Sequence, residues 1–562
     1  MSGCRIFVLE SGRSGMDRRK YVKTGKAAGM VVSFAALRQA DRPLRIVARI
    51  VPALLALSLA LAAGAKAQEK TQDAPSDPSA TAASQKAGEK GRDAKAPAGP
   101  SASEQHRLPP DSTTKQTVVL PGRTLAFTAT AGSIRLFDDK GEAQADIAYT
   151  AYQLDGADVA TRPVTFLFNG GPGAASAYLQ LGAAGPWRLP ISGDAGLSSA
   201  SPDLQPNAET WLDFTDLVFI DPVGTGYSRF VASGEDVRKH FFSVDGDVKS
   251  LAVVIRRWLE KSNRLLSPKF VAGESYGGIR TPKIVRELQT DQGVGVKGLI
   301  LLSPVLDFRE FTGSSILQYM VSLPTMAAVA REKKGPVTRA DMADVERYAS
   351  GDFLADLIKG SADTEATNRL ADKVAALTGI DQAVSRRLAG RFDAIEFRRE
   401  FDRRDGKVTG RYDASVMGLD PYPDSSFYHF RDPSGDPLVA PLTSAVVDLT
   451  TRKLNWRPDG SYRLLNEAVD KAWNFGHGIN PPESTSQLRE ILAFDPKLKL
   501  LIGHGLFDLA TPYFGSKILL DQLPAFASPE RVKLVVYPGG HMFYSRDASR
   551  QAFRTEVQTL MK

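Results

Sequence analysis

Short apolar runs separated by polar turns organise the chain from about Gln116 onward. Three runs rich in β-formers, at 117–120, 125–130 and 147–152, are divided by Gly and Asp turns and predict an antiparallel meander. Longer apolar runs then alternate with helical stretches, and each run ends in a Gly-rich or Asp-bearing loop. These runs lie at 164–168, 217–220, 270–272, 299–302, 498–502 and 532–537. Continuous apolar strands alternating with helices indicate a parallel sheet covered on both faces.

The alternation stops between about residues 307 and 482. Charged amphipathic stretches such as 339–355 and 368–388 take its place and predict a mostly helical cap inserted into the sheet domain. The predicted architecture is therefore α/β, with a mostly parallel central sheet and helices on both faces. Residues 116–306 and 483–562 are predicted to form its sheet domain, and a helix from about Ala548 closes the chain.

The N-terminal part has the composition of a leader and a tether. Three arginines precede an apolar run and an Ala-Lys-Ala sequence, so residues 1–67 predict a secretory signal cleaved after Ala67. An uncleaved membrane anchor is the alternative, and Met30 is an alternative start of translation. Residues 68–115 hold almost no aromatic or β-branched side chains and predict a disordered linker. We expect an exported protein, periplasmic or secreted.

Charge and cysteine content narrow the classes of partner. The whole chain carries a net charge of +7, but residues 1–67 contribute +9, which leaves −2 for the rest. The body therefore has no net basic charge with which to hold phosphates, and nucleic-acid binding is not expected. The one cysteine, Cys4, lies in the leader, so the cleaved protein would have neither disulfide nor thiol. Few and scattered histidines predict no metal site, and no cofactor is implied.

A segment between a predicted strand and a predicted helix carries the first candidate chemistry. The run 270–272 leads into Gly-Glu-Ser-Tyr-Gly-Gly and then into the helical stretch 281–288. In this context G-x-S-x-G is what a nucleophile elbow requires, because small residues permit the tight turn that exposes the hydroxyl of Ser275. Alone, the motif also fits a plain strand-to-helix turn, so the presence of a suitable base and acid decides between the two interpretations.

A serine nucleophile needs a base, and the base needs a carboxylate that fixes its tautomer. The histidines after Ser275 are His429, His477, His504 and His541. Only His541 lies in a Gly-Gly-His turn directly after a late strand, and it is the predicted base. Asp508, in the loop after the preceding strand, is the predicted acid and completes the order Ser, acid, His. His504 is the alternative base, but it precedes the acid, and a structural histidine is the favoured interpretation.

The loop Phe-Asn-Gly-Gly-Pro-Gly follows the first strongly apolar parallel strand. A developing oxyanion needs two fixed donors, and glycines let the backbone come close enough to supply one. The amides of Gly171 and Tyr276 are the predicted oxyanion hole. A dinucleotide-binding loop is the alternative, but Ser176 stands where its third glycine belongs.

Together these segments resemble the serine carboxypeptidases, which are serine exopeptidases of the α/β-hydrolase fold. The resemblance covers roughly residues 120–305 and 495–562. It rests on N-G-G-P-G, G-E-S-Y-G-G, D-P-V-G-T-G-Y-S, the Asp508 loop and G-H-M at His541. It implies release of C-terminal amino acids from peptide substrates with a free C-terminus, and it implies that Asn169 and Glu274 grip the carboxylate of the last residue.

The implied grip has a chemical consequence. An Asn can donate through its amide, whereas a Glu can hold a carboxylate only if the pair shares a proton. Substrate binding should therefore weaken as pH rises, which predicts a mildly acidic optimum. The alternatives are a helix-start acid for Glu274 and a turn residue for Asn169.

Three positions depart from the family pattern: Leu167 replaces a Trp, Ala174 replaces a disulfide-forming Cys, and the loop 221–226 is shortened. A carboxylesterase or acyltransferase would use the same triad without needing Asn169 and Glu274. A proline aminopeptidase would normally show His at position 169, and a noncatalytic binding protein would not need the triad. The stretch 422–428 and Trp473 hold candidate pocket aromatics, with core packing as the favoured alternative.

Overall fold

A computed structural model describes residues 107–191, 203–311, 315–426, 431–476 and 481–562. All of them lie in one compact unit, Lys95–Lys562. The predicted leader and most of the predicted linker lie outside the described residues. Among the described residues, no helix is long and apolar enough to cross a membrane.

The folded part begins ahead of the predicted Gln116. Strand β1 spans Ser112–Leu120, and before it the carboxylate of Asp111 accepts a hydrogen bond of 2.5 Å from the hydroxyl of Tyr149. The predicted linker is therefore wrong for residues 107–115. The composition of this segment could not show that it is folded, because the side chains that bind its polar residues, such as Tyr149 for Asp111, lie elsewhere in the sequence.

One ten-stranded sheet runs through the described residues in the order β1-β2-β3-β7-β4-β9-β10-β13-β14, with β8 paired to β3. The first three strands form the predicted antiparallel meander, β3 pairs antiparallel with β7, and the pairs from β7 to β14 are parallel. The remaining strands are β2 Arg123–Phe137, β3 Ala143–Leu154, β4 Val164–Phe168, β7 Asp216–Ile220, β8 Arg229–Phe230, β9 Lys269–Glu274, β10 Gly298–Leu302, β13 Lys499–Gly505 and β14 Val532–Tyr537.

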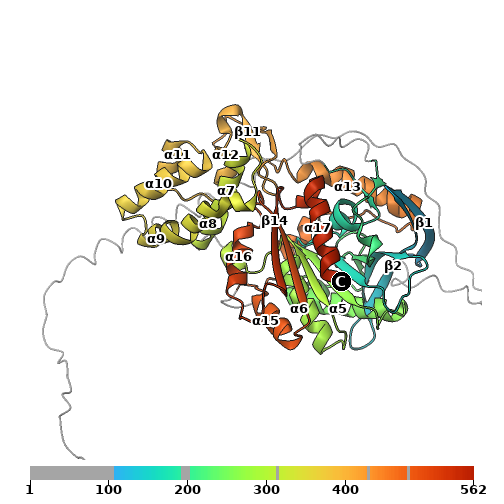
Figure 1. Cartoon of the computed structure of the whole chain (residues 1–562). Coiled ribbons are helices and arrows are strands. Elements are labelled where there is room, and N and C mark those ends of the chain that lie inside the picture. Colours follow the sequence, from blue (N-terminus) through green and yellow to red (C-terminus); the bar gives the residue numbers. More distant parts are fainter. Residues whose placement is uncertain (1–106, 192–202, 312–314, 427–430, 477–480) are drawn as a thin grey trace, which may run out of the picture. The chain divides into compact units, whose positions relative to one another are not determined.

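Helices cover both faces of this sheet. One apolar core joins the strands to α13 (Asp436–Asp448) and α17 (Asp547–Met561), and the other joins them to α5 (Val244–Lys261), α6 (Gly277–Thr290) and α15 (Thr485–Phe494). Because side chains alternate along a strand, Leu167 enters the first core, whereas its neighbours on β4 enter the second. The α/β arrangement predicted from the continuous apolar runs, a mostly parallel sheet with helices on both faces, is confirmed (Figure 1).

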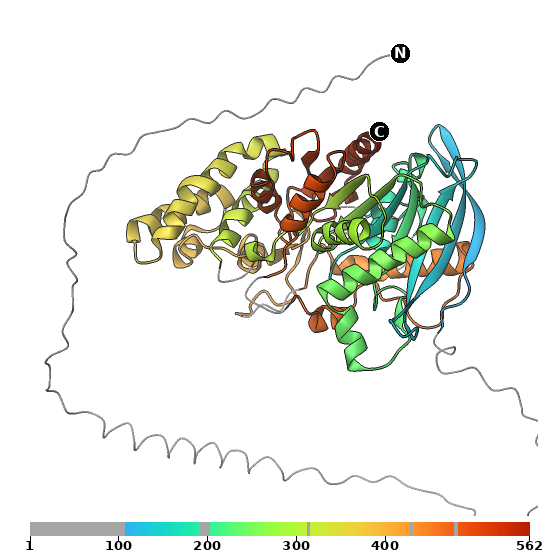
Figure 2. The same ribbon diagram turned by 90° about the horizontal axis from the view of Figure 1, so that it is seen from below.

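Between the neighbouring strands β10 and β13 the chain makes a long, mostly helical excursion. A backbone bridge between Asp307 and Glu483 joins its two ends. Its first part forms a helical layer with a third apolar core, visible as the yellow group in Figures 1 and 2. The helices of this layer are α7 Leu317–Glu332, α8 Ala343–Tyr348, α9 Leu354–Lys359, α10 Thr364–Thr378, α11 Gln382–Arg387 and α12 Ala394–Glu400, followed by the hairpin of β11 Lys407–Thr409 and β12 Met417–Leu419.

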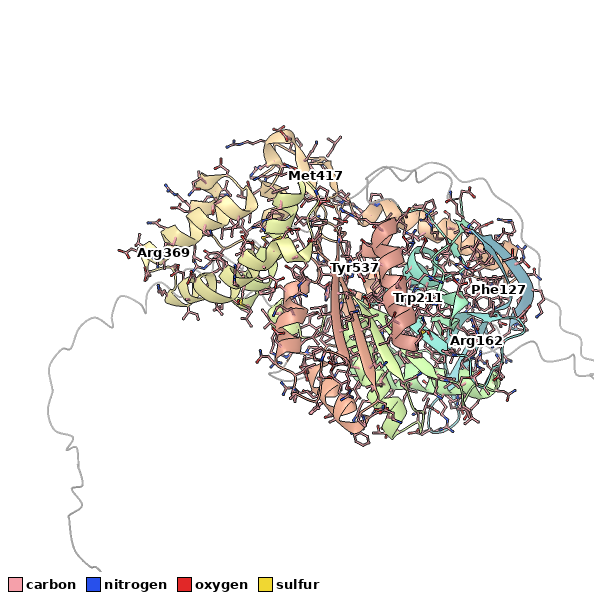
Figure 3. All side chains as sticks on the ribbon, in the orientation of Figure 1. Phe127, Arg162, Trp211, Arg369, Met417 and Tyr537 are labelled. Atoms are coloured by element: carbon pink, nitrogen blue, oxygen red, sulfur yellow. The ribbon has the colours of Figure 1, made fainter. Side chains whose placement is uncertain are left out.

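The later part of the excursion packs differently. Helix α13 and Trp456 belong to the core on the α17 face of the sheet, and Trp473 belongs to the core on the opposite face. The predicted cap of residues 307–482 thus comprises a separate helical layer and a segment that is integral to the sheet domain. Figure 3 labels Arg369 on the helical layer, and Phe127 and Trp211 in the core of the α17 face.

Candidate active site

Ser275 lies on the sharp turn between β9 and α6. Its φ of +61° is rare for a residue other than glycine and is the strained geometry of a nucleophile elbow. The turn is crowded: a Cβ atom at Gly273 would lie 2.2 Å from the hydroxyl of Thr281, and one at Gly278 would lie 2.2 Å from the carbonyl oxygen of Val305. The small residues of the motif are therefore required, and Ser275 itself stays partly exposed.

The loop after β4 lies directly against this elbow. A Cβ atom at Gly170 would lie 2.5 Å from the amide nitrogen of Tyr276 and 2.9 Å from the Cβ atom of Ser275. Gly171 is exposed and has a φ of +100°, a conformation that favours glycine. Within the described residues, the amides of Gly171 and Tyr276 donate to no protein acceptor. Both remain available to an oxyanion beside Ser275.

Asp508 and His541 meet in the loops after β13 and β14. The Nδ1 atom of His541 donates to Oδ2 of Asp508 at 2.8 Å, and both side chains are buried. Oδ1 of Asp508 accepts from the amides of Ala510 and Thr511 at 2.8 and 2.9 Å, and the Thr511 hydroxyl donates to Oδ2 at 2.6 Å. These donors fix the carboxylate that orients the imidazole.

The protonation of His541 reflects two opposing effects. Burial lowers the pKa of His541, but the charge and hydrogen bond of Asp508, together with the charge of Glu274, outweigh burial and leave this pKa raised. The residue after β10 links the catalytic loops. The hydroxyl of Ser303 donates to the His541 carbonyl at 2.7 Å, and the Ser303 carbonyl oxygen lies 2.9 Å from the hydroxyl oxygen of Thr511.

The elbow joins the same end of β10. The Ser275 amide donates to the Leu302 carbonyl at 3.0 Å, so all three predicted triad residues are tied to one junction. Within the described residues, no hydrogen bond joins the Ser275 hydroxyl to His541. Such bonds are often formed only when substrate is bound.

The competing histidine has a different environment. Nε2 of His504 lies 2.8 Å from the hydroxyl of Ser516, and the side chain is fully buried on β13. Burial is the main reason that the pKa of His504 falls to about 3, so it stays neutral at all ordinary pH values. His504 is a structural histidine, as interpreted from the sequence. His429 and His477 lie outside the described residues.

Glu274 is buried directly beside the nucleophile, with 3% of its surface exposed. The hydroxyl of Tyr544 donates to its Oε2 atom at 2.8 Å, and the Asn169 carboxamide also hydrogen-bonds it. Among the described residues, no Lys or Arg forms an ion pair with it. Burial raises the pKa of Glu274 to about 7, and His541, Tyr544 and Asn169 oppose this rise. The site therefore contains a carboxyl group that can hold a proton near neutral pH.

Asn169 is held in place by hydrogen bonds from Leu179 and Arg280. Its Oδ1 atom accepts from the amide of Leu179 at 3.0 Å, so its NH₂ group remains available to Glu274 and to a ligand. Its carbonyl oxygen accepts from Nη1 of Arg280 at 2.5 Å. Arg280 is fully buried and pairs with Asp247 at 2.6 Å. Through Arg280, helix α6 thus holds Asn169 at the start of the predicted oxyanion loop.

The match to a known family covers the stretch that holds Asn169, Glu274 and Ser275, whereas Asp508 and His541 lie outside it. Residues 124–346 match the serine carboxypeptidase family. Over this stretch the chain is similar to the serine carboxypeptidases. It is 30% identical over 148 residues to serine carboxypeptidase-like 13 of Arabidopsis thaliana, which is 26% of this chain and 33% of that relative. Serine carboxypeptidase-like 16 of the same plant is 27% identical over 176 residues, or 30% and 39% of the two chains.

The matched part of these curated relatives is thus only about a third of their length. The prohormone-processing carboxypeptidase of Saccharomyces cerevisiae has a similar fold, with a TM-score of 0.50 and 16% identity. That similarity covers 77% of this chain and 91% of the yeast chain. At this identity it establishes the fold alone.

The departures from the serine carboxypeptidase pattern have clear places in the structure. Leu167 is fully buried in the α17-side core, so its side chain offers no polar contact to a substrate. Ala174 forms a backbone bridge with Leu465 instead of a disulfide. Asp221 of the shortened loop is half-buried; desolvation raises its pKa to about 6, and its carboxylate accepts from the amide of Ser176 at 2.8 Å.

A strand-like segment from the excursion clamps the oxyanion loop and was not predicted. The Ala175 amide donates to the Leu464 carbonyl at 2.9 Å, and the Asn466 amide donates to the Gly173 carbonyl at 2.8 Å. Asn466 also donates through Nδ2 to the Gly224 carbonyl at 2.8 Å. No local sequence signal marks these contacts, because they join segments that are more than two hundred residues apart in the sequence.

Tyr412 contacts His541 and was also not predicted from the sequence as part of the site. Its carbonyl accepts from the His541 amide at 2.5 Å, and its ring lies 5.3 Å from the imidazole between centroids. The adjacent Arg411 carbonyl accepts from the Leu509 amide at 3.1 Å. Of the predicted pocket aromatics, Trp473 packs edge-to-face on Tyr276 behind the elbow, whereas Tyr422 is 57% exposed.

No group of three or more His, Cys, Asp or Glu side chains is placed to hold a metal ion in the part of the chain that the structure describes.

Proposed function

We propose that this protein is a serine carboxypeptidase that releases the C-terminal amino acid from peptides. The observation that carries the proposal is the buried carboxyl of Glu274 beside Ser275, hydrogen-bonded by Tyr544 and Asn169. A carboxypeptidase must recognise the free carboxylate of its substrate, and a buried carboxyl group that can hold a proton is able to donate to it. The match of residues 124–346 to the serine carboxypeptidase family supports the same conclusion.

The roles of the triad follow from its geometry. Oγ of Ser275 attacks the carbonyl carbon of the last peptide bond, and Nε2 of His541 accepts the hydroxyl proton. Asp508 holds the imidazole through Nδ1 and stabilises its charged form. The amides of Gly171 and Tyr276 donate to the oxyanion.

The tetrahedral intermediate then collapses. The C–N bond breaks, and His541 returns the proton to the departing amino group, which leaves an ester on Ser275. Water attacks this ester with His541 again as base, and release of the acid regenerates the hydroxyl. Each proton that His541 accepts is returned, so the net reaction is hydrolysis of one peptide bond.

Glu274 sets the condition for recognising the substrate. A protonated Glu274 donates to the terminal carboxylate, with Asn169 as a second donor, whereas an ionised Glu274 repels it. Since the pKa of Glu274 is raised to about 7, recognition is present below that pH and is lost as the pH rises through it. On the acid side, activity falls when His541 is protonated, because a charged imidazole cannot accept the serine proton.

The test compares a blocked dipeptide with its amide and its ester at about pH 5, 6, 7 and 8. We expect Ser275-dependent release of the C-terminal amino acid, a preference for the free carboxylate, and loss of this preference as pH rises. Ester cleavage without peptide cleavage would instead assign the triad to a carboxylesterase or acyltransferase. The Ser275→Ala variant serves as the inactive control.

We also propose that the enzyme acts outside the cytoplasm on peptides with a free C-terminus. The basic and apolar pattern of residues 1–67 supports export, with cleavage after Ala67. N-terminal sequencing of the protein from an exporting host should give Gln68 as the first residue. A protein that retains the leader in the membrane fraction would support the anchor instead.

A further inference from the structure

Tyr544 is held rigidly against Glu274 by the turn that follows His541. It lies in the short 3₁₀ helix Phe543–Ser545, and its side chain is fully buried. Its ring packs on Gly182, where a Cβ atom would lie 2.7 Å from Cε2, and its carbonyl accepts from Nη1 of Arg550 at 2.9 Å. With the ring and the backbone both fixed, the phenol can point only toward the Glu274 carboxyl, at 2.8 Å.

We propose that the Tyr544 hydroxyl is a positioning group that holds Glu274 toward the substrate carboxylate and limits carboxypeptidase activity to lower pH. This inference rests on the proposed function. It concerns a residue that no motif marks, on a turn whose recognised role is to carry the catalytic histidine. The base and the carboxylate grip would then be coupled through one short segment of chain.

The Tyr544 hydroxyl can be removed by substitution without changing the other groups that face Glu274. The titratable or polar groups that face Glu274 from the packed elements are His541, Asp508, Asn169, Tyr178 and Tyr544. His541 and Asp508 belong to the proposed triad, and Asn169 begins the oxyanion loop. Tyr178 is without a hydrogen-bond partner among the described residues, so only Tyr544 supplies a fixed phenolic donor to the carboxyl. The substitution Tyr544→Phe keeps the ring that packs on Gly182.

The direction of the effect follows from hydrogen-bond strength. A donor to an ionised carboxylate is roughly twice as strong as the same donor to a neutral carboxyl group. Tyr544 therefore favours the ionised form of Glu274, the form that cannot receive a substrate carboxylate. Removing the hydroxyl should move the ionisation of Glu274 to a pH about one unit higher, and the enzyme should keep its preference for free carboxylates over that added range.

The experiment measures KM and kcat of Tyr544→Phe on a blocked dipeptide and its amide from about pH 5 to pH 9. We expect the midpoint at which KM for the free acid rises to move up by about one pH unit, with the amide profile unchanged. Tyr149→Phe is the control, because it removes another hydroxyl–carboxylate bond, from the buried Tyr149 to the half-buried Asp111, that involves none of the residues facing Glu274. An unmoved midpoint, or an equal change for acid and amide, would overturn the inference.

A second readout keeps the test independent of the activity. Because the hydrogen bond is stronger to the ionised carboxyl, Tyr544→Phe should cost more unfolding stability at about pH 8.5 than at about pH 5. Equal costs at the two pH values would reject the inference. A wild-type enzyme that does not distinguish acid from amide would reject the proposed function, while the unfolding experiment would still decide the role of Tyr544.

Discussion

Replacing Glu274 with Gln should stabilise the protein at alkaline pH relative to acid pH, which is the reverse of the usual effect of removing a carboxylate. Gln has the shape of a protonated Glu and keeps a carbonyl oxygen that can accept from the Tyr544 hydroxyl. It carries no charge at any pH. The variant therefore isolates the cost of burying an ionised carboxyl at this position.

The magnitude follows from the raised pKa of Glu274. Its folded value of about 7 lies above the ordinary value of 4.5, so the folded state binds the proton more tightly. Stability is then fully present below about pH 4.5 and falls as the pH rises to about 7. A difference of about 2.5 pKa units at about 1.4 kcal/mol per unit corresponds to about 3 kcal/mol. The Gln variant should escape this loss.

The assay is urea unfolding of wild type and Glu274→Gln at about pH 5 and pH 8.5, with the linear extrapolation of the unfolding free energy. We expect the difference between variant and wild type to move in favour of the variant by about 2.5 kcal/mol across this range, because part of the full effect already lies below pH 5. Glu490→Gln, at an exposed ion pair with Arg286, is the control and should show little dependence on pH. A difference for Glu274→Gln that stays constant, or moves the other way, would refute the reasoning.

Three further substitutions test the supports of the site. Gly170→Ala places a methyl group 2.5 Å from the Tyr276 amide, so kcat should fall about 10²- to 10³-fold, as when one oxyanion donor is lost. A normal kcat would contradict the assignment of the Tyr276 amide as an oxyanion donor. Thr511→Val removes a 2.6 Å donor to Asp508, so kcat/KM should fall about tenfold for acid and amide substrates alike. A fall for the acid substrate alone would contradict the role of Thr511 in orienting Asp508. Arg280→Met leaves the buried carboxylate of Asp247 unpaired and should lower the free energy of unfolding in urea by about 3–5 kcal/mol. A loss under about 1 kcal/mol would contradict the importance of this buried ion pair.

The elements that carry the chemistry could be predicted because their signals are local. A buried parallel strand reads as a continuous apolar run, and the turns after β4, β9 and β14 each combine glycines with one functional side chain. The order of Ser275, Asp508 and His541 then followed from the fold. The structure places each of these residues after its predicted strand, and it brings Asp508 and His541 into contact.

The rest of the site depends on contacts that a local pattern cannot reveal. Tyr544 and Glu274 are 270 positions apart, and nothing near Tyr544 indicates which carboxyl its hydroxyl will reach. Arg280 looks like one more charged residue on an amphipathic helix, yet it is fully buried on Asp247. The start of the fold was placed too late for the same reason, since Asp111 is ordered by Tyr149 and not by its neighbours in sequence.

The most direct test of the proposed carboxypeptidase activity is the pH dependence of kcat/KM on one blocked dipeptide and its amide, with Ser275→Ala as the blank. A carboxypeptidase that grips its substrate through Glu274 should prefer the free acid at about pH 5 to 6 and lose that preference as the pH rises through about 7. Ser275-dependent cleavage with no preference for the acid at any pH would contradict the proposal and leave only a serine hydrolase.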